Sequence, residues 1–464
     1  MPATFMDSFG RFARSPGFKF FLVALLVLLL MIPLAFIWFL VTERETRARA
    51  VTQDVAQVWG GEQHLNGPFL LVPYTVKVVT AQGDKQIEQL QERRAVFLPD
   101  SLSVTGDAAT EIRKRSIYEV TVYTARLTLE GRFTSPDMSL ADADIVAVRW
   151  RDAVIAMGMS DVSGLKEAAT LLIDTVRPVA FEPSIGVPNS TMQGIHARLA
   201  GPEAGDQAPA PFTFQLKLAF SGSSVLDFAP VGRETKVTLA SNWPHPSFSG
   251  GFLPENRELR ADGFGANWRV PHLARSVPQV WSVVNTPASM YTLDRFAPHQ
   301  FGVQFYVPID YYDLVNRAAK YGLMFLAVAF MAVFVLELMS RKSVHPVQYV
   351  LVGLAMILFY ALLLSLAEHI GFPLAYVAAS AATGGMLSLY VGYALASAAK
   401  GLIMLTVFFI LYGLLYLILR LEDYALLAGT VAGFVMLTVT MFATLRVNWS
   451  GDGTTLSSGR QQAE

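Results

Sequence analysis

The chain of 464 residues contains no cysteine. This absence excludes disulfide bonds, thiolate metal ligands and a cysteine nucleophile. The sequence also has almost no net charge, since 36 Lys and Arg residues face 37 Asp and Glu residues, which gives a formal charge of −1. That balance offers no argument for binding DNA or RNA, and we expect no nucleic-acid partner.

Short catalytic motifs are missing as well. No H-E-x-x-H, G-x-S-x-G, G-x-x-x-x-G-K-[ST] or G-x-G-x-x-G pattern occurs in the chain, so the usual sequence signals of zinc proteases, serine hydrolases and nucleotide-binding loops are lacking. His245, His272 and His299 could be brought together around a metal by folding, but their spacing does not support such a site. We therefore predict no catalytic residue, no cofactor and no metal.

Apolar sequence, in contrast, is abundant. Hydrophobic residues make up 53% of the chain and charged residues 16%, and the mean hydropathy is +0.41. A membrane-spanning helix needs about 20 mostly apolar residues, because its backbone polar groups must be satisfied within the helix. Six segments meet this requirement, and we predict six spans: Phe18–Val41, Tyr321–Met339, Val344–Ala367, Phe372–Ala399, Gly401–Leu419 and Tyr424–Leu445.

Basic residues next to short loops predict the orientation of these spans, since such residues tend to stay in the cytoplasm. A path with both termini inside places seven of them on the cytoplasmic side: Arg11, Arg14, Lys19, Arg341, Lys342, Lys400 and Arg446. The resulting layout is a cytoplasmic N-terminus (1–17), an uncleaved anchor (18–41), an extracytoplasmic domain (42–319), a five-helix bundle (320–446) and a disordered cytoplasmic tail (447–464).

Ionisable residues inside the bilayer are costly and often functional. Glu337 lies close to the end of its predicted helix, and Lys400 lies at a loop, so both side chains are expected to reach the membrane interface. Glu368 falls at a helix end as well. Because no carboxylate or basic group is predicted near the middle of the membrane, the sequence argues against a proton-coupled transporter.

The middle stretch is predicted to be rich in β-strands. Apolar residues at helical spacing extend the anchor helix to Trp59, and Gly60 should end it. Gly67-Pro68 predicts a turn, and the stretch 201–211 a loop or possible subdomain break. Alternating or β-branched runs predict strands at Phe69–Thr80, Ser116–Thr134, Phe212–Phe220, Lys236–Leu239 and Gln300–Pro308. The predicted fold class is therefore an α+β membrane protein.

Two stretches of the chain resemble the CreD family of bacterial inner-membrane proteins. The first contains Trp59-Gly60, Gln63, Leu65, Gly67-Pro68, Leu70 and Val72-Pro73-Tyr74. The second contains Ser241 to Phe248, Phe252-Leu253-Pro254, Gly263-Phe264, Ala266, Trp268 and Pro278-Gln279-Val280-Trp281. The resemblance extends over essentially the whole chain. It implies an inner-membrane protein under two-component control, linked to envelope integrity, biofilm behaviour, β-lactam response and colicin tolerance, and it carries over no catalytic residue.

An aromatic segment late in the middle domain has two interpretations. Its residues could form a periplasmic binding surface that stacks on a glycan ring or an acyl chain, with Trp243, His245, Phe248, Phe252, Phe264 and Trp268 as the candidates. Alternatively, the prolines and glycines shape turns while the aromatic rings fill a core beneath them.

Small residues recur every fourth position in the fourth predicted span. This ridge consists of Ser380, Gly384, Ser388, Gly392 and Ala396, and Gly429 and Gly433 repeat the pattern in the sixth span. Small side chains allow another helix to approach closely. The partner helix would belong either to the same bundle or to a second copy in a homo-oligomer.

Three functional hypotheses follow. The leading one is a non-enzymatic inner-membrane protein that supports envelope integrity, whose periplasmic domain binds an envelope component such as a glycan, or a partner protein; membrane lipids are expected contacts. The second is a transporter or channel for a lipidic or amphiphilic compound, although too few polar residues line the predicted spans and no inverted halves are visible. The third, a membrane-tethered hydrolase, would need clustered carboxylates or a Ser/His pair.

Overall fold

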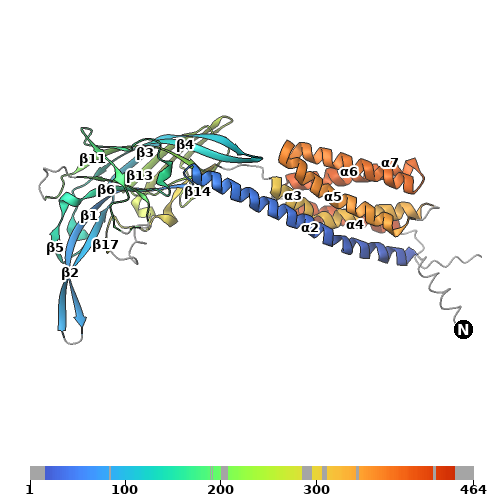
Figure 1. Ribbon diagram of the computed structural model, residues 1–464, viewed down its shortest axis with the longest axis horizontal. Coiled ribbons are helices and arrows are strands. Elements are labelled where there is room, and N and C mark those ends of the chain that lie inside the picture. Colours follow the sequence, from blue (N-terminus) through green and yellow to red (C-terminus); the bar gives the residue numbers. More distant parts are fainter. Residues whose placement is uncertain are drawn as a thin grey trace, which may run out of the picture. The chain divides into compact units, whose positions relative to one another are not determined.

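The computed structural model describes residues 16–82, 85–188, 190, 192–199, 207–284, 295–305, 311–340, 344–421 and 425–444. The chain forms two compact units, one of Arg49–Pro308 and one of Met1–Ala48 with Ile309–Glu464. Strands make up most of the first unit and helices the second, as Figure 1 shows. The predicted combination of an apolar N-terminal helix, a β-rich middle and an apolar C-terminal helix cluster is confirmed.

A helix of the described residues lies in each predicted apolar segment, and α3 (Tyr311–Lys320) precedes the second of these segments. The described helices are α2 (Pro16–Val58), α3 (Tyr311–Lys320), α4 (Gly322–Leu338), α5 (Pro346–Ile370), α6 (Phe372–Ala394), α7 (Ala398–Arg420) and α8 (Ala425–Thr444). Within the described part, α2, α5, α6 and α7 are long and apolar enough to cross a membrane, and α3 with α4, bent by 49°, could form a fifth span. The number of six spans therefore stays a prediction.

Two predicted boundaries were wrong. The fourth segment, 372–399, contains the end of α6 and the start of α7, and Ala396 lies in the turn between them with a φ of +47°. Helix α3 was assigned to the middle domain (42–319) but belongs to the helical unit. Its Tyr312 and Val315 are buried there because α3 packs on α5. The predicted tail (447–464) and basic residues Arg11, Arg14, Arg341, Lys342 and Arg446 lie outside the described residues.

The strand-rich unit contains two sheets. The first has ten strands in the order β14-β18-β12-β1-β6-β10-β9, with β2 and β5 also paired to β1 and β17 paired to β2. Its strands are β1 (Gln63–Gln82), β2 (Lys85–Phe97), β5 (Ile145–Val148), β6 (Val154–Gly158), β9 (Glu182–Pro183), β10 (Gly194–Arg198), β12 (Val225–Phe228), β14 (Pro246–Gly250), β17 (Val280–Val284) and β18 (Phe301–Phe305).

The second sheet has eight strands in the order β15-β16-β13-β3-β4-β11-β7-β8. They are β3 (Ser101–Arg115), β4 (Tyr118–Phe133), β7 (Thr170–Ile173), β8 (Arg177–Ala180), β11 (Phe212–Ser223), β13 (Glu234–Ser241), β15 (Asn256–Arg260) and β16 (Gly263–Pro271). Short 3-10 helices lie at Met138–Leu140 (η1), Trp150–Asp152 (η2), Val162–Gly164 (η3), His272–Ala274 (η4) and Ala297–His299 (η6).

One hydrophobic core joins the two sheets. Strand β11 shows the predicted alternation, with Phe212, Phe214, Leu216, Leu218 and Phe220 buried in this core. Side chains of the ten-stranded sheet, such as Leu70 and Ile155, belong to the same core. The possible break at 201–211 falls partly outside the described residues, where the chain passes from β10 in one sheet to β11 in the other.

Gly67-Pro68 forms no turn. It is a cis peptide bond inside β1, at the point where the pairing of β1 with β6 shifts between Asn66 and Phe69. Proline has no backbone N–H to donate, so it fits where a sheet ladder is interrupted. The predicted end of the anchor helix at Gly60, in contrast, is confirmed, since α2 ends at Val58.

Candidate functional site

The conspicuous Trp59-Gly60 pair marks the junction between α2 and the sheets. The Trp59 ring lies within cation–π distance of two cations, with the Arg113 guanidinium 4.7 Å and the Lys166 ammonium 4.6 Å from its centroid. The Trp59 indole N–H donates to the Tyr123 carbonyl at 3.4 Å. Trp59 therefore fastens the end of the helix to β3, β4 and the segment after η3.

Close backbone contacts hold the next residues of this junction. Gly60 has a φ of +107°, and an added Cβ would lie 2.6 Å from the Ser221 carbonyl oxygen and 2.8 Å from the Gly164 Cα. Only glycine fits such a position. The buried Gln63 amide donates to the carbonyls of Gly60 and Asp161, at 2.5 and 2.8 Å. This part of the sequence pattern thus fixes the path of the chain.

Asn242 has a comparable structural role in the second stretch. Its side-chain oxygen accepts hydrogen bonds from the backbone N–H and the hydroxyl of Thr110, both at 2.7 Å, and its amide donates to the Thr110 carbonyl at 3.0 Å. These three bonds extend the pairing of β13 with β3 beyond the last paired residues, Ser241 and Ala108.

The aromatic candidates do not form one binding surface. Phe264 and Trp268 are buried in the core, and the Phe248 ring packs edge-on against both, with centroids 5.6 and 5.7 Å away. Trp243 and Phe252 are half-buried and pack against the same core, whereas His245 is exposed. The interpretation as a surface is wrong for Phe264 and Trp268, because the alternation of β16 turns them inward; the core interpretation fits them.

The small-residue ridge packs inside the helical unit. A methyl group added at Gly384 would lie 3.4 Å from Phe408 Cβ, and one at Gly392 would lie 3.2 Å from Gly401 Cα, so both glycines face α7. The other members are placed as follows: Ser388 is buried, Ser380 is half-buried, Ala396 lies beyond α6, and Gly429 and Gly433 face Tyr321 and Met324. This placement agrees with helix packing within one bundle.

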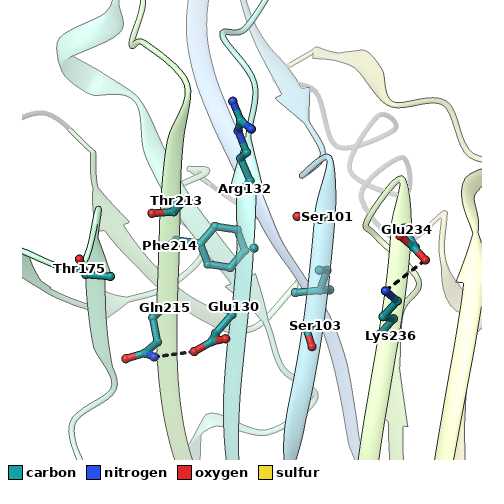
Figure 2. A pocket seen from close by; sticks show the side chains of 12 residues that line it. Ser101, Ser103, Glu130, Arg132, Thr175, Thr213, Phe214, Gln215, Glu234 and Lys236 are labelled. Carbon is teal, nitrogen blue, oxygen red and sulfur yellow. Dashed lines mark hydrogen bonds and ion pairs between the residues drawn. The ribbon is translucent and has the colours of Figure 1, made fainter.

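An open hollow of about 470 Å³ lies on the outer face of the eight-stranded sheet, and Figure 2 shows it from close by. It is lined by Ser101, Leu102, Ser103, Glu130, Gly131, Arg132, Thr175, Thr213, Phe214, Gln215, Glu234 and Lys236. They come from β13, β3, β4 and β11 and from the turn between β7 and β8. Ten of the twelve are polar or glycine, so the hollow offers several hydrogen-bonding groups to a hydrated ligand.

Two rows of paired residues cross this hollow. The first row runs Glu234, Ser101, Arg132 and Thr213, and the second runs Lys236, Ser103, Glu130 and Gln215. In each row a hydroxyl lies between an acidic and a basic residue, and the order of the charges is opposite in the two rows. Positive and negative groups therefore alternate around two central serines.

Most charges of the hollow have neighbours. The Gln215 amide donates to Glu130 at 2.6 Å, and Glu234 pairs with Lys236 at 3.4 Å and with Arg269 at 2.8 Å. Desolvation opposes ionisation of Glu234, but the two cations outweigh it and hold the pKa of its carboxyl below the usual range. Among the described residues, Arg132 has no acidic partner, so its guanidinium is available to a ligand.

The rim of the hollow has strained backbone. Asp174 and Thr175, in the turn between β7 and β8, have φ values of 49° and 60°. Such values are uncommon for any residue except glycine and unusual for a β-branched one. The turn is held by Asp174 Oδ1, which accepts hydrogen bonds from the Thr213 N–H and hydroxyl, at 2.8 and 3.2 Å.

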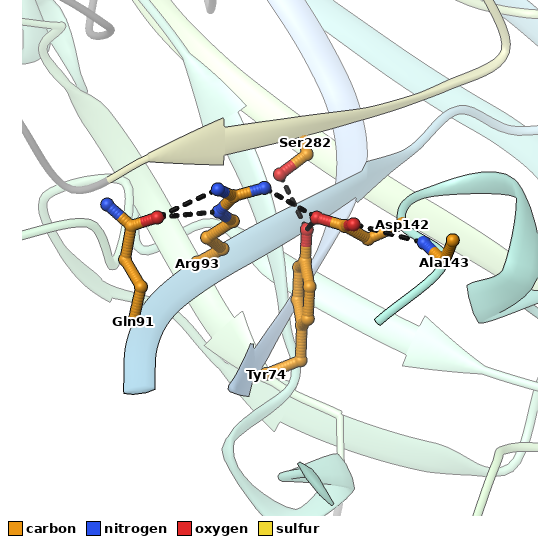
Figure 3. Close-up of polar contacts among 6 residues, drawn as sticks. All are labelled: Tyr74, Gln91, Arg93, Asp142, Ala143 and Ser282. Atoms are coloured by element: carbon orange, nitrogen blue, oxygen red, sulfur yellow. Dashed lines mark hydrogen bonds and ion pairs between the residues drawn. The ribbon is translucent and has the colours of Figure 1, made fainter. Parts of the chain in front are cut away.

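A second polar network lies in the ten-stranded sheet, where Figure 3 shows Tyr74, Ser282 and Asp142 meeting. The Tyr74 and Ser282 hydroxyls are 2.5 Å apart, and Tyr74 donates to Asp142 at 3.4 Å, while Arg93 pairs with Asp142 at 2.6 Å. Burial raises the pKa of Tyr74 above its usual value, so the phenol keeps its proton near neutral pH. Tyr74 is therefore no general base for Ser282, and the network holds strands and a loop together.

Another pair brings together residues that are far apart in sequence. His64 Nδ1 lies 3.0 Å from an Asp227 carboxylate oxygen, and the His64 backbone N–H donates to the Ser160 hydroxyl. His64 is not one of the three histidines, His245, His272 and His299, that the sequence offers as possible metal ligands. Within the described residues, no three His, Asp or Glu side chains gather as metal ligands would.

Glu337, which the sequence places near the end of its helix, is enclosed by protein groups. Its side chain is only 6% exposed, and its oxygens accept hydrogen bonds from Lys19 at 2.7 Å, Tyr349 at 2.8 Å and the Val344 N–H at 3.0 Å. A buried carboxylate needs such partners. Through Lys19 and Tyr349, Glu337 links α4 to α2 and α5.

Glu368 is also largely buried in the helical unit. It accepts a hydrogen bond from the Tyr312 hydroxyl at 3.2 Å and lies 4.0 Å from the Arg44 guanidinium. Glu337 and Glu368 are thus largely buried carboxylates of the helical unit, and each has a partner on α2.

Comparison with known proteins is decisive for the family. The family described as "Inner membrane protein CreD" matches residues 15–450. This chain belongs to the CreD family. It is 33% identical over 423 residues to the inner membrane protein CreD of Escherichia coli (strain K12), and the match covers 91% of each chain. Membership identifies an inner membrane protein, in agreement with the apolar helices.

The CreD-like stretches are explained by the fold. Trp59, Gly60, Gln63 and Asn242 fix chain junctions, and Trp268 fills the core.

The hollow could not be recognised from the sequence, because most of its polar side chains lie at ordinary solvent-facing positions of four different strands. The alternation of β3, β4 and β11 could have assigned each to an outer face, but only the strand order places them together.

Proposed function

We propose that this CreD family member is a non-enzymatic protein that supports envelope integrity, and that its strand-rich unit binds an envelope component or partner protein in the periplasm. The hollow on the eight-stranded sheet carries the proposal, because it combines hydrogen-bonding groups with Arg132, which has no acidic partner in the described part of the chain. In this proposal, membrane lipids surround the apolar helices. The predicted path of six spans with both termini in the cytoplasm would put the strand-rich unit on the periplasmic side.

The absence of enzymatic activity is supported by the chemistry of the polar groups. A serine nucleophile needs a base that accepts its proton. Tyr74, which hydrogen-bonds to Ser282, keeps its own proton near neutral pH because burial raises its pKa, so it does not take the serine proton.

In-cell photocrosslinking tests this proposal. A photoreactive residue at Ser103, on the floor of the hollow, should capture an envelope component. A matched residue at Asn256, exposed on β15 of the same sheet and outside the hollow, should capture much less. Equal labelling from both positions, or none from Ser103, would contradict binding in the hollow.

The buried carboxylates give the alternative, a transporter or channel for a lipidic or amphiphilic compound, one supporting observation. Glu337 and Glu368 lie inside the helical unit, where transporters often keep such groups. Both are held by partners on α2, however, which favours a structural role. Rapid reaction of a Thr383→Cys variant, buried in α6, with a small water-soluble thiol reagent would indicate an aqueous path and favour the transporter.

A further inference from the structure

We infer that the hollow binds a cell-wall glycopeptide, meaning a ligand that carries sugar hydroxyls, a carboxylate and an amino group on one molecule. This inference rests on the proposed function and names the class of envelope component.

The charges of the hollow select for this class. Its ionisable residues are Glu130, Glu234, Arg132 and Lys236, two acidic and two basic, so their formal charges cancel. A strongly anionic polymer would find no net attraction here. A ligand with both signs of charge matches the alternation of the two rows.

The centre of the hollow suits hydroxyl groups. Ser101 and Ser103 lie on β3 between the charged residues, and both are exposed. Thr213 and Gln215 add a hydroxyl and an amide on β11. Each of these groups can donate and accept hydrogen bonds, as sugar hydroxyls and peptide groups require.

Arg132 is the expected contact for the ligand carboxylate. A guanidinium presents several N–H donors in one plane and can bind a carboxylate through two parallel hydrogen bonds. Arg126 provides a control, because it lies on the same strand and the same exposed face but outside the hollow.

The strained rim supplies an independent argument. Thr175 lies at the edge of the hollow with a φ of 60°, where glycine would be more stable. Strained backbone of this kind often clusters at functional sites. A Thr175→Gly variant should therefore stabilise the fold and weaken the binding of the ligand, a combination that a purely structural role does not predict.

Binding of a soluble disaccharide–tetrapeptide from peptidoglycan to the full chain in nanodiscs tests the inference. We expect saturable binding that Arg132→Glu weakens by at least about tenfold and that Arg126→Glu leaves unchanged. Thr175→Gly should raise the Tm by roughly 2 to 4 °C and weaken binding by roughly fivefold. An uncharged N-acetylglucosamine oligomer and anionic phospholipids in the nanodisc should not compete.

Different failures have different meanings. If the glycopeptide does not bind, or binds equally to Arg132→Glu and Arg126→Glu, the ligand class is wrong. If the Ser103 photocrosslinker still captures another envelope component in cells, the proposed function survives that result. If neither experiment detects a ligand, both the inference and the proposed function are overturned.

Discussion

Lys19 and Glu337 are 318 positions apart in the chain, yet the Lys19 ammonium donates a 2.7 Å hydrogen bond to Glu337 inside the helical unit. The pair joins the N-terminal part of α2 to the end of α4. Because Glu337 is 6% exposed, its charge depends on this cation and on the Tyr349 hydroxyl.

The first prediction concerns this ion pair. Lys19→Met should lower the stability of the helical unit by about 3 kcal/mol, because it leaves a buried charge without its cation. The double variant Lys19→Met/Glu337→Gln should recover much of that loss, since neither charge remains. Thermal unfolding of the full chain in detergent measures both. Equal losses in the single and double variants would contradict the dependence of the buried carboxylate on Lys19.

The second prediction concerns the junction after α2. Gly60→Ala should destabilise the strand-rich unit by about 1 to 3 kcal/mol, because the new Cβ meets the Ser221 carbonyl oxygen at 2.6 Å in a backbone conformation that alanine rarely adopts. Gly265→Ala is the control, since nothing lies within 4 Å of a Cβ added there. Tryptophan fluorescence during urea unfolding reports the difference, and equal midpoints would contradict the tight junction.

The third prediction separates packing from oligomerisation. Gly384→Leu should disrupt the contact of α6 with Phe408 on α7 and reduce the yield of folded protein. Gly385→Leu, one position further along the same helix, should be tolerated because no neighbour lies within 4 Å of an added Cβ. Size-exclusion chromatography with light scattering measures both. A folded Gly384→Leu protein of lower particle mass would instead indicate a seam between copies.

The fourth prediction is a pH dependence. Burial raises the pKa of Tyr74 in the folded state above its unfolded value, so the stability that this group contributes is complete below about pH 10 and is lost as the pH rises further. Tyr74→Phe should therefore lower stability near neutral pH by about 1 kcal/mol but reduce the additional loss at alkaline pH. Ser282→Ala, which keeps the phenol, should retain that alkaline loss. The midpoints of urea unfolding, measured near neutral pH and at alkaline pH, distinguish these outcomes.

Local patterns were sufficient to predict much of the fold. The alternation from Phe212 to Phe220 predicted a half-buried strand, and β11 buries those side chains. The same rule applied to Phe264, Ala266, Trp268 and Val270 would have placed Phe264 and Trp268 in the core. The aromatic composition of that segment obscured its alternation.

Contacts between distant residues could not be predicted. Nothing in the sequence near Glu337 indicates Lys19, and nothing near Arg132 indicates Glu234 or Thr213 as neighbours in a row. Strand order and helix packing determine these contacts, whereas periodicity reports only which face of an element is buried. The hollow depends on strand order, and the contacts of the buried carboxylates depend on helix packing.

The most direct test of the account uses the absence of cysteine. A single Ser103→Cys variant places one thiol in the hollow, and a Lys400→Cys variant places one on the predicted cytoplasmic side. A membrane-impermeant maleimide applied to intact spheroplasts should label the cysteine at position 103 and leave the one at position 400 unlabelled until the cells are lysed. Labelling at position 103 only after lysis would place the strand-rich unit in the cytoplasm and contradict the proposed envelope-binding role.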